Sequence, residues 1–247
     1  MKIIISPAKK MNVDTDSLSV KRMPSILHKT EELKQWIQGL SWEETKKLWK
    51  CNDKLVDLNF ERFREMDLYK SLTPAILAYE GLQYQYMAPG VMEESQHAYI
   101  QEHLRIISGF YGLLAPFDGV VPYRLEMQAK AQVNGQKDLY EFWGDIIYKT
   151  LTKNDHTILN LASKEYSKAI EPYLQEQDQF ITCVFGEYKD GKVIQKGTMA
   201  KMARGEMVNF LSGTDADSPE DAKKFNRLEY QYREDLSTEE EYVFLRN

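Results

Sequence analysis

The chain has 247 residues, of which 43% are hydrophobic and 12% aromatic, enough for a packed core and too many for a disordered protein. Its net charge of −6 argues against a generally basic surface that coats nucleic acid. Any site for a polyanion must therefore be a focused cleft.

The spacing of the cysteines and the lengths of the apolar runs exclude several further classes of protein. Cys51 and Cys183 lie in segments without a CxxC spacing or companion histidines, so the sequence indicates neither a disulfide framework nor a zinc site. The apolar run Ile3 to Ile5 is too short for a signal peptide, and no later segment reaches membrane-spanning length. We expect a cytoplasmic protein with no membrane segment, no metal site and no bound cofactor.

The N-terminal quarter predicts one strand followed by helices. Ile3 to Ile5 form a β-branched run that suits a short buried strand, and the loop Ser6 to Lys10 after it presents lysine. Residues 25–68 are expected to be helical. Within them, Ser41 and Glu44 have the spacing of a capping box, in which each side chain satisfies the backbone N–H of the other residue.

The region before the middle of the chain mixes helical and strand signals. Residues 73–87 are ambiguous between a short helix with a strand and two strands. Residues 93–102 suit a helix, and residues 104–107 suit a strand.

The most informative segment is residues 109–122, which are apolar but interrupted by three glycines and two prolines. So apolar a segment must be buried, and the glycines and prolines favour an irregular core loop. The segment leads into Tyr123 to Met127. If that stretch is extended, Arg124 and Glu126 lie on the same side, because strand side chains repeat every second residue.

The remaining expected elements are a single helix at 138–152, a strand at 156–161, a hairpin of 180–188 with 193–196 around Asp190-Gly191, a helix at 198–211, and strands within 225–232 and 242–245.

Basic residues beside apolar segments are the first candidates for a site: Lys9, Arg105, Arg124, Lys201 and Arg204. A spacing of three puts Lys201 and Arg204 on one face of their helix. Arginine suits phosphate by its rigid fork and lysine by its point charge, so these side chains, if they converge, form a pocket for phosphate or a nucleic-acid backbone. The alternative is that each one pairs with a nearby surface carboxylate.

Carboxylates in apolar or turn contexts are the second group of candidates: Asp118, Glu126, Asp145 and Glu165. A pair of them that meets in one cleft would suit acid and base chemistry. The alternative is structural, with carboxylates that cap helices or neutralise Arg124 and Lys201.

Six ordered motifs span most of the chain: Ile5–Lys10, His103–Arg105 with Gly109–Gly112, Pro122–Met127, Lys137–Asp145, Asn160–Tyr166 and Lys201–Gly205. Together they resemble the YaaA family of peroxide-stress proteins.

The resemblance implies a cytoplasmic bacterial protein that helps cells survive hydrogen peroxide by limiting free iron, and with it iron-driven damage to DNA and protein. It also implies that double-stranded DNA binds in a positively charged cleft. The fold that it implies is α+β, with residues 1–247 forming a single domain in which helices surround a mixed β-sheet.

The resemblance further implies a helix-hairpin-helix element, for which Thr45 to Arg64 is the best candidate. Leu55 to Asn59 would occupy the hairpin position. Asp57 stands where relatives tend to have glycine, and we expect its charge to weaken the approach of phosphate to the backbone.

Three functions remain open from the sequence. The leading one is a DNA-associating stress protein whose five basic residues surround a phosphate-bearing ligand. The second is an enzyme that acts on a nucleobase, nucleotide or damaged DNA in the same cleft, with Asp118, Glu126 or Glu165 as acid or base and Lys9 as nucleophile. The third is an iron-binding buffer, which the scarcity of clustered ligands disfavours. The oligomeric state stays open.

Overall fold

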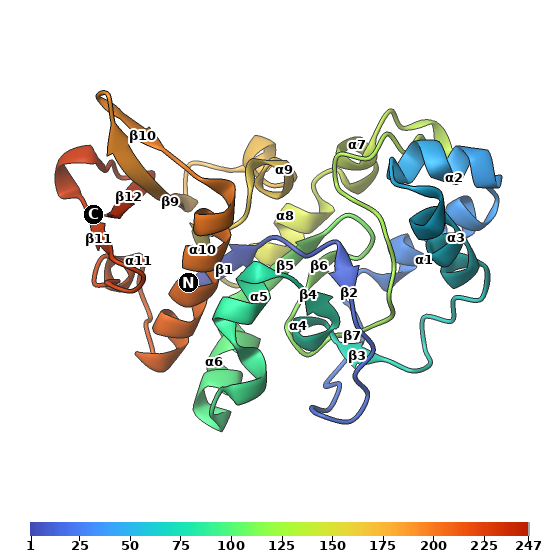
Figure 1. The fold of residues 1–247 in the computed structure, drawn as a ribbon, viewed down its shortest axis with the longest axis horizontal. Helices are drawn as coiled ribbons and strands as arrows, with labels where there is room; N and C mark the ends of the chain where they lie inside the picture. Colours follow the sequence, from blue (N-terminus) through green and yellow to red (C-terminus); the bar gives the residue numbers. More distant parts are fainter. Residues whose placement is uncertain (247) are drawn as a thin grey trace.

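The computed structural model describes residues 1–246, and its framework is an eight-stranded mixed sheet (Figure 1). The strands are β1 (Lys2–Ile5), β5 (Leu104–Ser108), β6 (Gly112–Leu114), β8 (Thr157–Asn160), β9 (Gln179–Lys189), β10 (Lys192–Ile194), β11 (Tyr230–Tyr232) and β12 (Glu241–Arg246). Their order is β11-β12-β9-β8-β1-β5-β6, with β10 paired to β9. Neighbouring strands from β12 to β5 are parallel, whereas β6, β10 and β11 pair antiparallel. The predicted α+β fold with a mixed sheet is confirmed.

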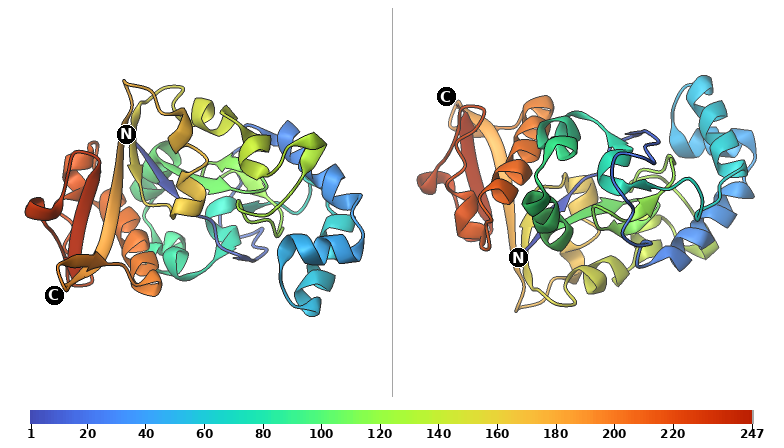
Figure 2. Two further views of the ribbon diagram at one scale, coloured as in Figure 1. Left: turned by 90° about the horizontal axis from the view of Figure 1, so that it is seen from above. Right: turned by 90° about the horizontal axis from the view of Figure 1, so that it is seen from below.

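Helices cover both faces of the sheet (Figure 2). One face carries α5 (Leu82–Met87), α6 (Glu94–His103) and α10 (Gly197–Gly213), and the other carries α7 (Leu139–Trp143), α8 (Ile146–Leu151) and α9 (Lys164–Ser167). This arrangement explains why Ile3, Ile4 and Ile5 of the central strand are all fully buried. None of the helices in the described part of the chain combines the length and apolar composition needed to cross a membrane.

Smaller elements surround this core. Helices α1 (Leu27–Gln38), α2 (Trp42–Trp49) and α3 (Asp53–Arg64) stand beyond the β6 edge of the sheet (Figure 1). Two short strand pairs join β2 (Lys10–Met11) to β4 (Tyr79–Glu80) and β3 (Thr73–Pro74) to β7 (Gly119–Val120). The remaining helices are α4 (Ala75–Ala78), α11 (Pro219–Ala222) and 3₁₀ turns at Pro89–Val91, Val133–Gly135, Glu171–Tyr173 and Glu234–Leu236.

Of two predictions about helices, the structure confirms one and contradicts the other. The capping box is confirmed, because Ser41 Oγ accepts from the Glu44 N–H and Glu44 Oε2 accepts from the Ser41 N–H at 2.8 Å. The single helix predicted at 138–152 is wrong: it is divided into α7 and α8 at Gly144, which has φ +50° and ψ −136°. That backbone conformation is open to glycine and ends a helix, although the apolar spacing continues through it.

The predicted hairpin at Leu55 to Asn59 is also wrong, because these residues lie inside α3. The side chain of Asn52 accepts from the Leu55 N–H at 3.0 Å, so it caps α3 and starts the helix earlier than expected. The turn between α2 and α3 is Lys50 to Asn52. Asp57 accepts from Trp42 Nε1 at 2.8 Å, so its carboxylate joins α3 to α2 and does not stand in a hairpin.

The segment 109–122 is buried through Val121, as predicted, and contains the short strands β6 and β7. The stretch Tyr123 to Met127 that follows alternates between buried and partly exposed residues, with Arg124 and Glu126 on the accessible side. Gly109 lies against this stretch so closely that a Cβ there would stand 2.6 Å from the Leu125 carbonyl oxygen. The end of β5 therefore fixes where Arg124 and Glu126 emerge.

Replacing Gly109 with alanine is expected to destabilise the fold by about 1 to 3 kcal/mol, as overpacking of a core does. The added methyl would meet backbone atoms of Leu125, Glu126 and Met127 at 2.6 to 3.0 Å, and these atoms cannot rotate away as a side chain would. Chemical denaturation measures the loss. Gly90→Ala is the matched control, since nothing lies within 4 Å of a Cβ at Gly90. Equal stability of the two variants would contradict this account of Gly109.

Candidate functional site

The candidate site lies at the carboxyl edge of the parallel strands, where β1 and β8 end in hydrogen-bonded loops. Ser6 Oγ accepts from the Ser163 N–H at 2.9 Å, and the two hydroxyl oxygens are 3.3 Å apart. Tyr84 Oη donates to the Ser6 carbonyl at 3.0 Å. These bonds tie the loop after β1 to the loop after β8 and to helix α5, so they hold the backbone that carries Lys9. Carboxyl ends of parallel strands are a common place for ligands.

Glu126 is the shared partner of two cations at this edge. Its Oε1 lies 3.0 Å from Lys9 Nζ and 3.3 Å from an Arg124 Nη2 donor. The Arg124 side chain is only 13% exposed, whereas that of Lys9 is 66% exposed. Arg124 Nε is buried and has no hydrogen-bond partner among the described residues. One carboxylate therefore faces two positive charges and leaves a buried donor free.

Glu165 adds a second carboxylate beside this group. Its Oε1 accepts from the Gln128 N–H at 3.3 Å. Burial raises the pKa of Glu165 above its usual range, and repulsion from Glu126 adds to the rise, while the hydrogen bond from the Gln128 N–H and the charge of Lys9 partly offset it. The pKa of the neighbouring Tyr166 is also raised by burial. The structure thus brings together Lys9, Arg124, Glu126 and Glu165 from among the predicted residues.

A pocket of about 320 Å³ opens between this group and the end of helix α2. It is lined by Leu48, Trp49, Lys50, Arg124, Glu126, Gln128, Ala129 and Lys130. Trp49 is only 4% exposed, and within residues 1–246 its Nε1 has no hydrogen-bond partner, as is also the case for Arg124 Nε. Buried donors are nearly always paired in proteins, so these two residues of the pocket lining are unusual, although protein atoms cover both nitrogens.

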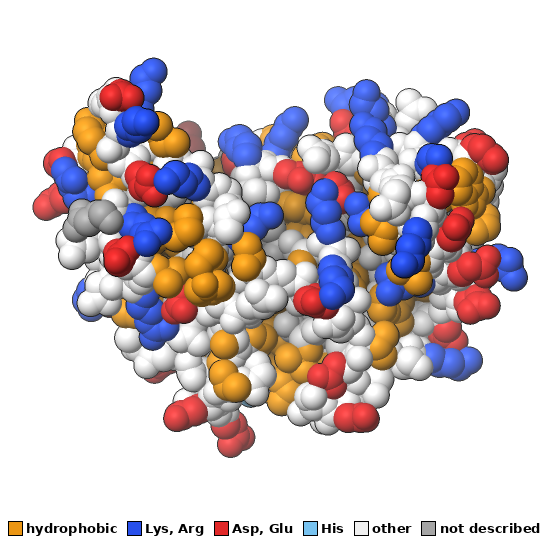
Figure 3. All heavy atoms as spheres, in the orientation of Figure 1, with side chains coloured by type: hydrophobic (Ala, Val, Ile, Leu, Met, Phe, Trp, Pro, Cys, Tyr) orange, Lys and Arg blue, Asp and Glu red, His pale blue; other side chains and the backbone are white. Residues whose placement is uncertain are grey.

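The face that carries the carboxyl edge is hollowed at its centre, and Lys and Arg side chains stand around the hollow with a few carboxylates between them (Figure 3). Lys50 and Lys130 are exposed and form no ion pair with another described residue. Lys50 also ends α2 in the left-handed conformation, with φ 45°. The entrance of the 320 Å³ pocket is therefore positively charged.

The structure does not bring Arg105 or Asp118 into contact with Lys9, Arg124 or Glu126 among the described residues. The Arg105 guanidinium donates to the Gln101 and Leu104 carbonyls and lines a pocket with Lys2, whereas Lys9 pairs with Glu126. Asp118 is fully buried, where its Oδ1 lies 2.6 Å from Arg22 Nε and its Oδ2 accepts from the Ala115 N–H. Burial raises the pKa of Asp118, although its Arg22 partner opposes this.

Lys201 and Arg204 lie on α10, which packs on α5 and β9. Lys201 is exposed, whereas Arg204 is largely buried near the Cys183 thiol, and this burial lowers the pKa of its guanidinium. Arg204 Nε has no partner among residues 1–246. Within that range no ion pair or hydrogen bond joins either side chain to Lys9 or Arg124, so their part in the same site stays a prediction.

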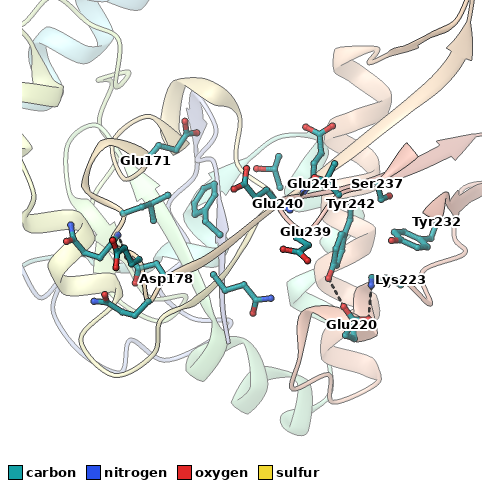
Figure 4. Close-up of a pocket in the computed structure, with 18 of the residues that line it drawn as sticks. Glu171, Asp178, Glu220, Lys223, Tyr232, Ser237, Glu239, Glu240, Glu241 and Tyr242 are labelled. Atoms are coloured by element: carbon teal, nitrogen blue, oxygen red, sulfur yellow. Dashed lines mark hydrogen bonds and ion pairs between the residues drawn. The ribbon is translucent and has the colours of Figure 1, made fainter. Parts of the chain in front are cut away.

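A depression larger than the pocket beside Arg124 has the opposite charge. Its volume is about 1380 Å³, and carboxylates from three regions line it, among them Glu171, Asp178, Glu220, Glu239, Glu240 and Glu241 (Figure 4). Such a surface repels phosphate, so it is not the expected anion site. Across the described part of the chain, no three His, Cys, Asp or Glu side chains are grouped so that they could hold a metal ion.

Comparison of the chain with known proteins identifies its family. The family model described as peroxide stress protein YaaA matches residues 1–236. The chain belongs to the YaaA family. Relatives named UPF0246 protein from Agathobacter rectalis and Pediococcus pentosaceus are each 56% identical to it, over 246 and 247 residues. The alignments cover 100% of this chain and 99% and 98% of the relatives. The predicted family is confirmed, and its name links the chain to peroxide stress.

Sequence reasoning missed several residues of this YaaA family member's site. Trp49 and Lys50 were expected only as part of a helical region, and Lys130 was not singled out. The sequence did contain a signal for Lys50. Asn52 is a residue that typically caps the start of a helix, so the residues just before it, including Lys50, were candidates for a turn between two helices. No sequence signal showed that the indole N–H of Trp49 has no partner, because that depends on packing between distant segments.

Replacing Glu165 with glutamine is expected to stabilise the fold at pH 7 to 8, by less than about 1 kcal/mol because this carboxylate is only half-buried. Its pKa is raised in the folded protein, so the ionised form weakens the fold. The gain should vanish toward pH 4, below the ordinary pKa of 4.5, where wild-type Glu165 is itself protonated. Melting temperatures at pH 4 and pH 8 measure both limits. An equal gain at the two pH values would contradict this explanation.

Proposed function

We propose that this chain acts in the cytoplasm in the response to peroxide stress by binding a phosphate-bearing ligand, double-stranded DNA in the first place, at the carboxyl edge of its sheet. The bound protein would help to limit iron-driven oxidative damage to the DNA. The observation that carries the proposal is the pocket whose lining holds three cationic side chains, Lys50, Arg124 and Lys130, and one carboxylate, Glu126.

The charges around this pocket support an anionic ligand. Arg124 shares its carboxylate partner, Glu126, with Lys9, so the group of three has an excess of positive charge. Lys50 and Lys130 add two exposed cations at the entrance. A nucleic-acid backbone presents repeated phosphates to such cations, and the arginine fork can take two phosphate oxygens at once.

The position of the turn Lys50 to Asn52 supports contact with a long ligand. It lies at the surface between α2 and α3, and Lys50 belongs both to the turn and to the pocket. Asp57 accepts a hydrogen bond from Trp42 and lies within α3, so its carboxylate does not stand in the turn. The short turn, and not residues 55 to 59, is therefore the candidate contact with a duplex.

Replacing Arg124 with alanine is expected to weaken binding of a short DNA duplex about tenfold or more, and to lower the slope of log affinity against log salt by about 1. The reason is the loss of a charge that pairs directly with phosphate. Fluorescence anisotropy between about 50 and 200 mM salt measures both quantities. Arg233→Ala is the matched control, because Arg233 is exposed and pairs with Asp235 in the last third of the chain.

Unchanged affinity and slope in Arg124→Ala, with a melting temperature equal to that of the wild type, would reject the carboxyl edge as the DNA site. Failure of the wild-type protein to bind duplex at the lower salt concentration would reject DNA as the ligand.

The second candidate function is an enzyme acting on a nucleobase, nucleotide or damaged DNA in the same place. Glu165 favours it, because a carboxyl group whose pKa is raised beside a second carboxylate is suited to proton transfer. Lys9 does not fit the nucleophile role that we expected, since its side chain is 66% exposed and paired with Glu126, and an activated lysine is usually desolvated.

This alternative predicts that Glu165→Gln lowers turnover of nucleotides or of damaged DNA at least about a hundredfold, while affinity for the same molecules changes little. Single-turnover assays and anisotropy measure the two effects separately. Absence of turnover by the wild-type protein would leave binding alone as the function.

A further inference from the structure

A second basic pocket lies at the opposite, amino edge of the sheet. Its volume is about 490 Å³, and it opens between the starts of β1 and β5, the last turn of α8 and residues 22–26. Five cationic side chains line it, namely Lys2, Arg22, Arg105, Lys149 and Lys153, and its lining includes no carboxylate. We call it the amino-edge pocket.

Only two of the five cations are neutralised by direct ion pairs. Arg22 Nε lies 2.6 Å from Asp118, and Lys149 Nζ lies 2.7 Å from Asp145. Lys2, Arg105 and Lys153 form no ion pair with any residue from 1 to 246. The pocket therefore holds about three positive charges without a direct partner, in a protein whose net charge is −6.

The deepest two cations are held in place by backbone carbonyls. Lys2 Nζ donates to the Glu102 carbonyl at 2.8 Å. Arg105 Nη1 donates to the carbonyls of Gln101 and Leu104 at 3.0 and 2.6 Å. Neutral oxygens orient these side chains but do not cancel their charge, and the remaining guanidinium N–H groups of Arg105 stay available for a ligand.

The pocket also carries an electrostatic cost in the absence of a ligand. Burial lowers the pKa of Lys2 and of Arg105, and after burial the largest contributions are repulsion from Arg105 on Lys2 and from Arg22 on Arg105. Nearby carboxylates, Asp155 and Glu102 for Lys2 and Asp118 and Glu102 for Arg105, offset only part of this. Groups of like charge in a confined space are stabilised by a counter-charge that binds between them.

The floor of the pocket is apolar. Ile26, Leu113 and Leu151 line it and are each between 3% and 4% exposed. Small-molecule sites typically have volumes of about 300 to 1,000 Å³, and in this pocket a few apolar side chains stand among convergent polar groups. The combination fits a ligand with a compact cluster of negative charge and an uncharged part that rests on the floor.

We propose that the amino-edge pocket binds a small molecule that carries two or more phosphate groups, of the nucleoside diphosphate class. Arg105 and Lys2 hold the phosphates at depth, Lys153 and Arg22 close over them from the rim, and the apolar floor takes the nucleoside. A duplex presents its phosphates on a convex surface and would reach only the exposed rim residues Arg22, Lys149 and Lys153, so it fits this hollow poorly.

The test is isothermal titration of the full-length protein with ADP and, separately, with inorganic pyrophosphate. Lys153→Glu is expected to weaken ADP binding about tenfold or more, because it reverses a charge beside the phosphates. Lys153 is exposed, so this variant should fold normally. Arg105→Gln tests the deep position and is expected to have an effect at least as large.

Lys189→Glu is the matched control, since it makes the same charge reversal on the exposed β9–β10 hairpin and should leave ADP binding unchanged. Arg124→Ala should also leave it unchanged, which separates this pocket from the carboxyl edge. Absence of ADP binding, or binding by Lys153→Glu and Arg105→Gln that equals the wild type, would overturn the proposal. A loss in Arg124→Ala in place of Lys153→Glu would overturn it as well.

The pyrophosphate titration separates the two parts of the ligand. Tighter binding of ADP than of pyrophosphate is expected and supports the nucleoside on the apolar floor. Equal binding would overturn that part of the proposal and assign the pocket to phosphate groups alone.

Discussion

The candidate site depends on one close backbone contact, that of Gly109 with Leu125 to Met127. Gly109 directly follows β5, so its position is set by the central sheet. Hydrogen bonds reinforce the contact: Trp143 Nε1 donates to the Gly109 carbonyl at 3.1 Å, and the Ser108 and Tyr123 hydroxyls are 2.6 Å apart. Residues 123–127 are extended, and their buried side packs against the core. The alternate residues Arg124 and Glu126 must therefore face outward. The core thereby determines the geometry of a polar site.

Charge is distributed unevenly in this protein, so its net charge does not describe its local surfaces. Carboxylates gather in the hollow at the starts of β9 and β12, where they face each other across open space. Cations gather at the carboxyl edge and in the amino-edge pocket. The local field near a ligand, rather than the net charge of −6, decides where an anion binds, since charges in solution are screened within about 10 Å.

Much of the fold was predictable from local patterns, because strand and helix periodicity, the capping box and the burial of 109–122 follow from neighbouring residues. The break at Gly144 was not, since the apolar spacing continues through it. For the site, the alternation that pairs Arg124 with Glu126 was visible in the sequence. The separation of Arg105 from Lys9 was not, because a sequence motif does not tell in which direction a strand side chain such as Arg105 points. Partners such as Trp49 come from distant segments and leave no local signal.

Strand β1 has a consequence for how the two basic regions relate to each other. It has four residues, so Lys2 at one end and the loop of Ser6 at the other are separated by only about 13 Å along the strand. Hydrogen bonds to β5 and β8 on both sides prevent the strand from sliding. Strand β1 therefore holds the carboxyl edge and the amino-edge pocket at a constant separation. A single compact ligand cannot span both regions.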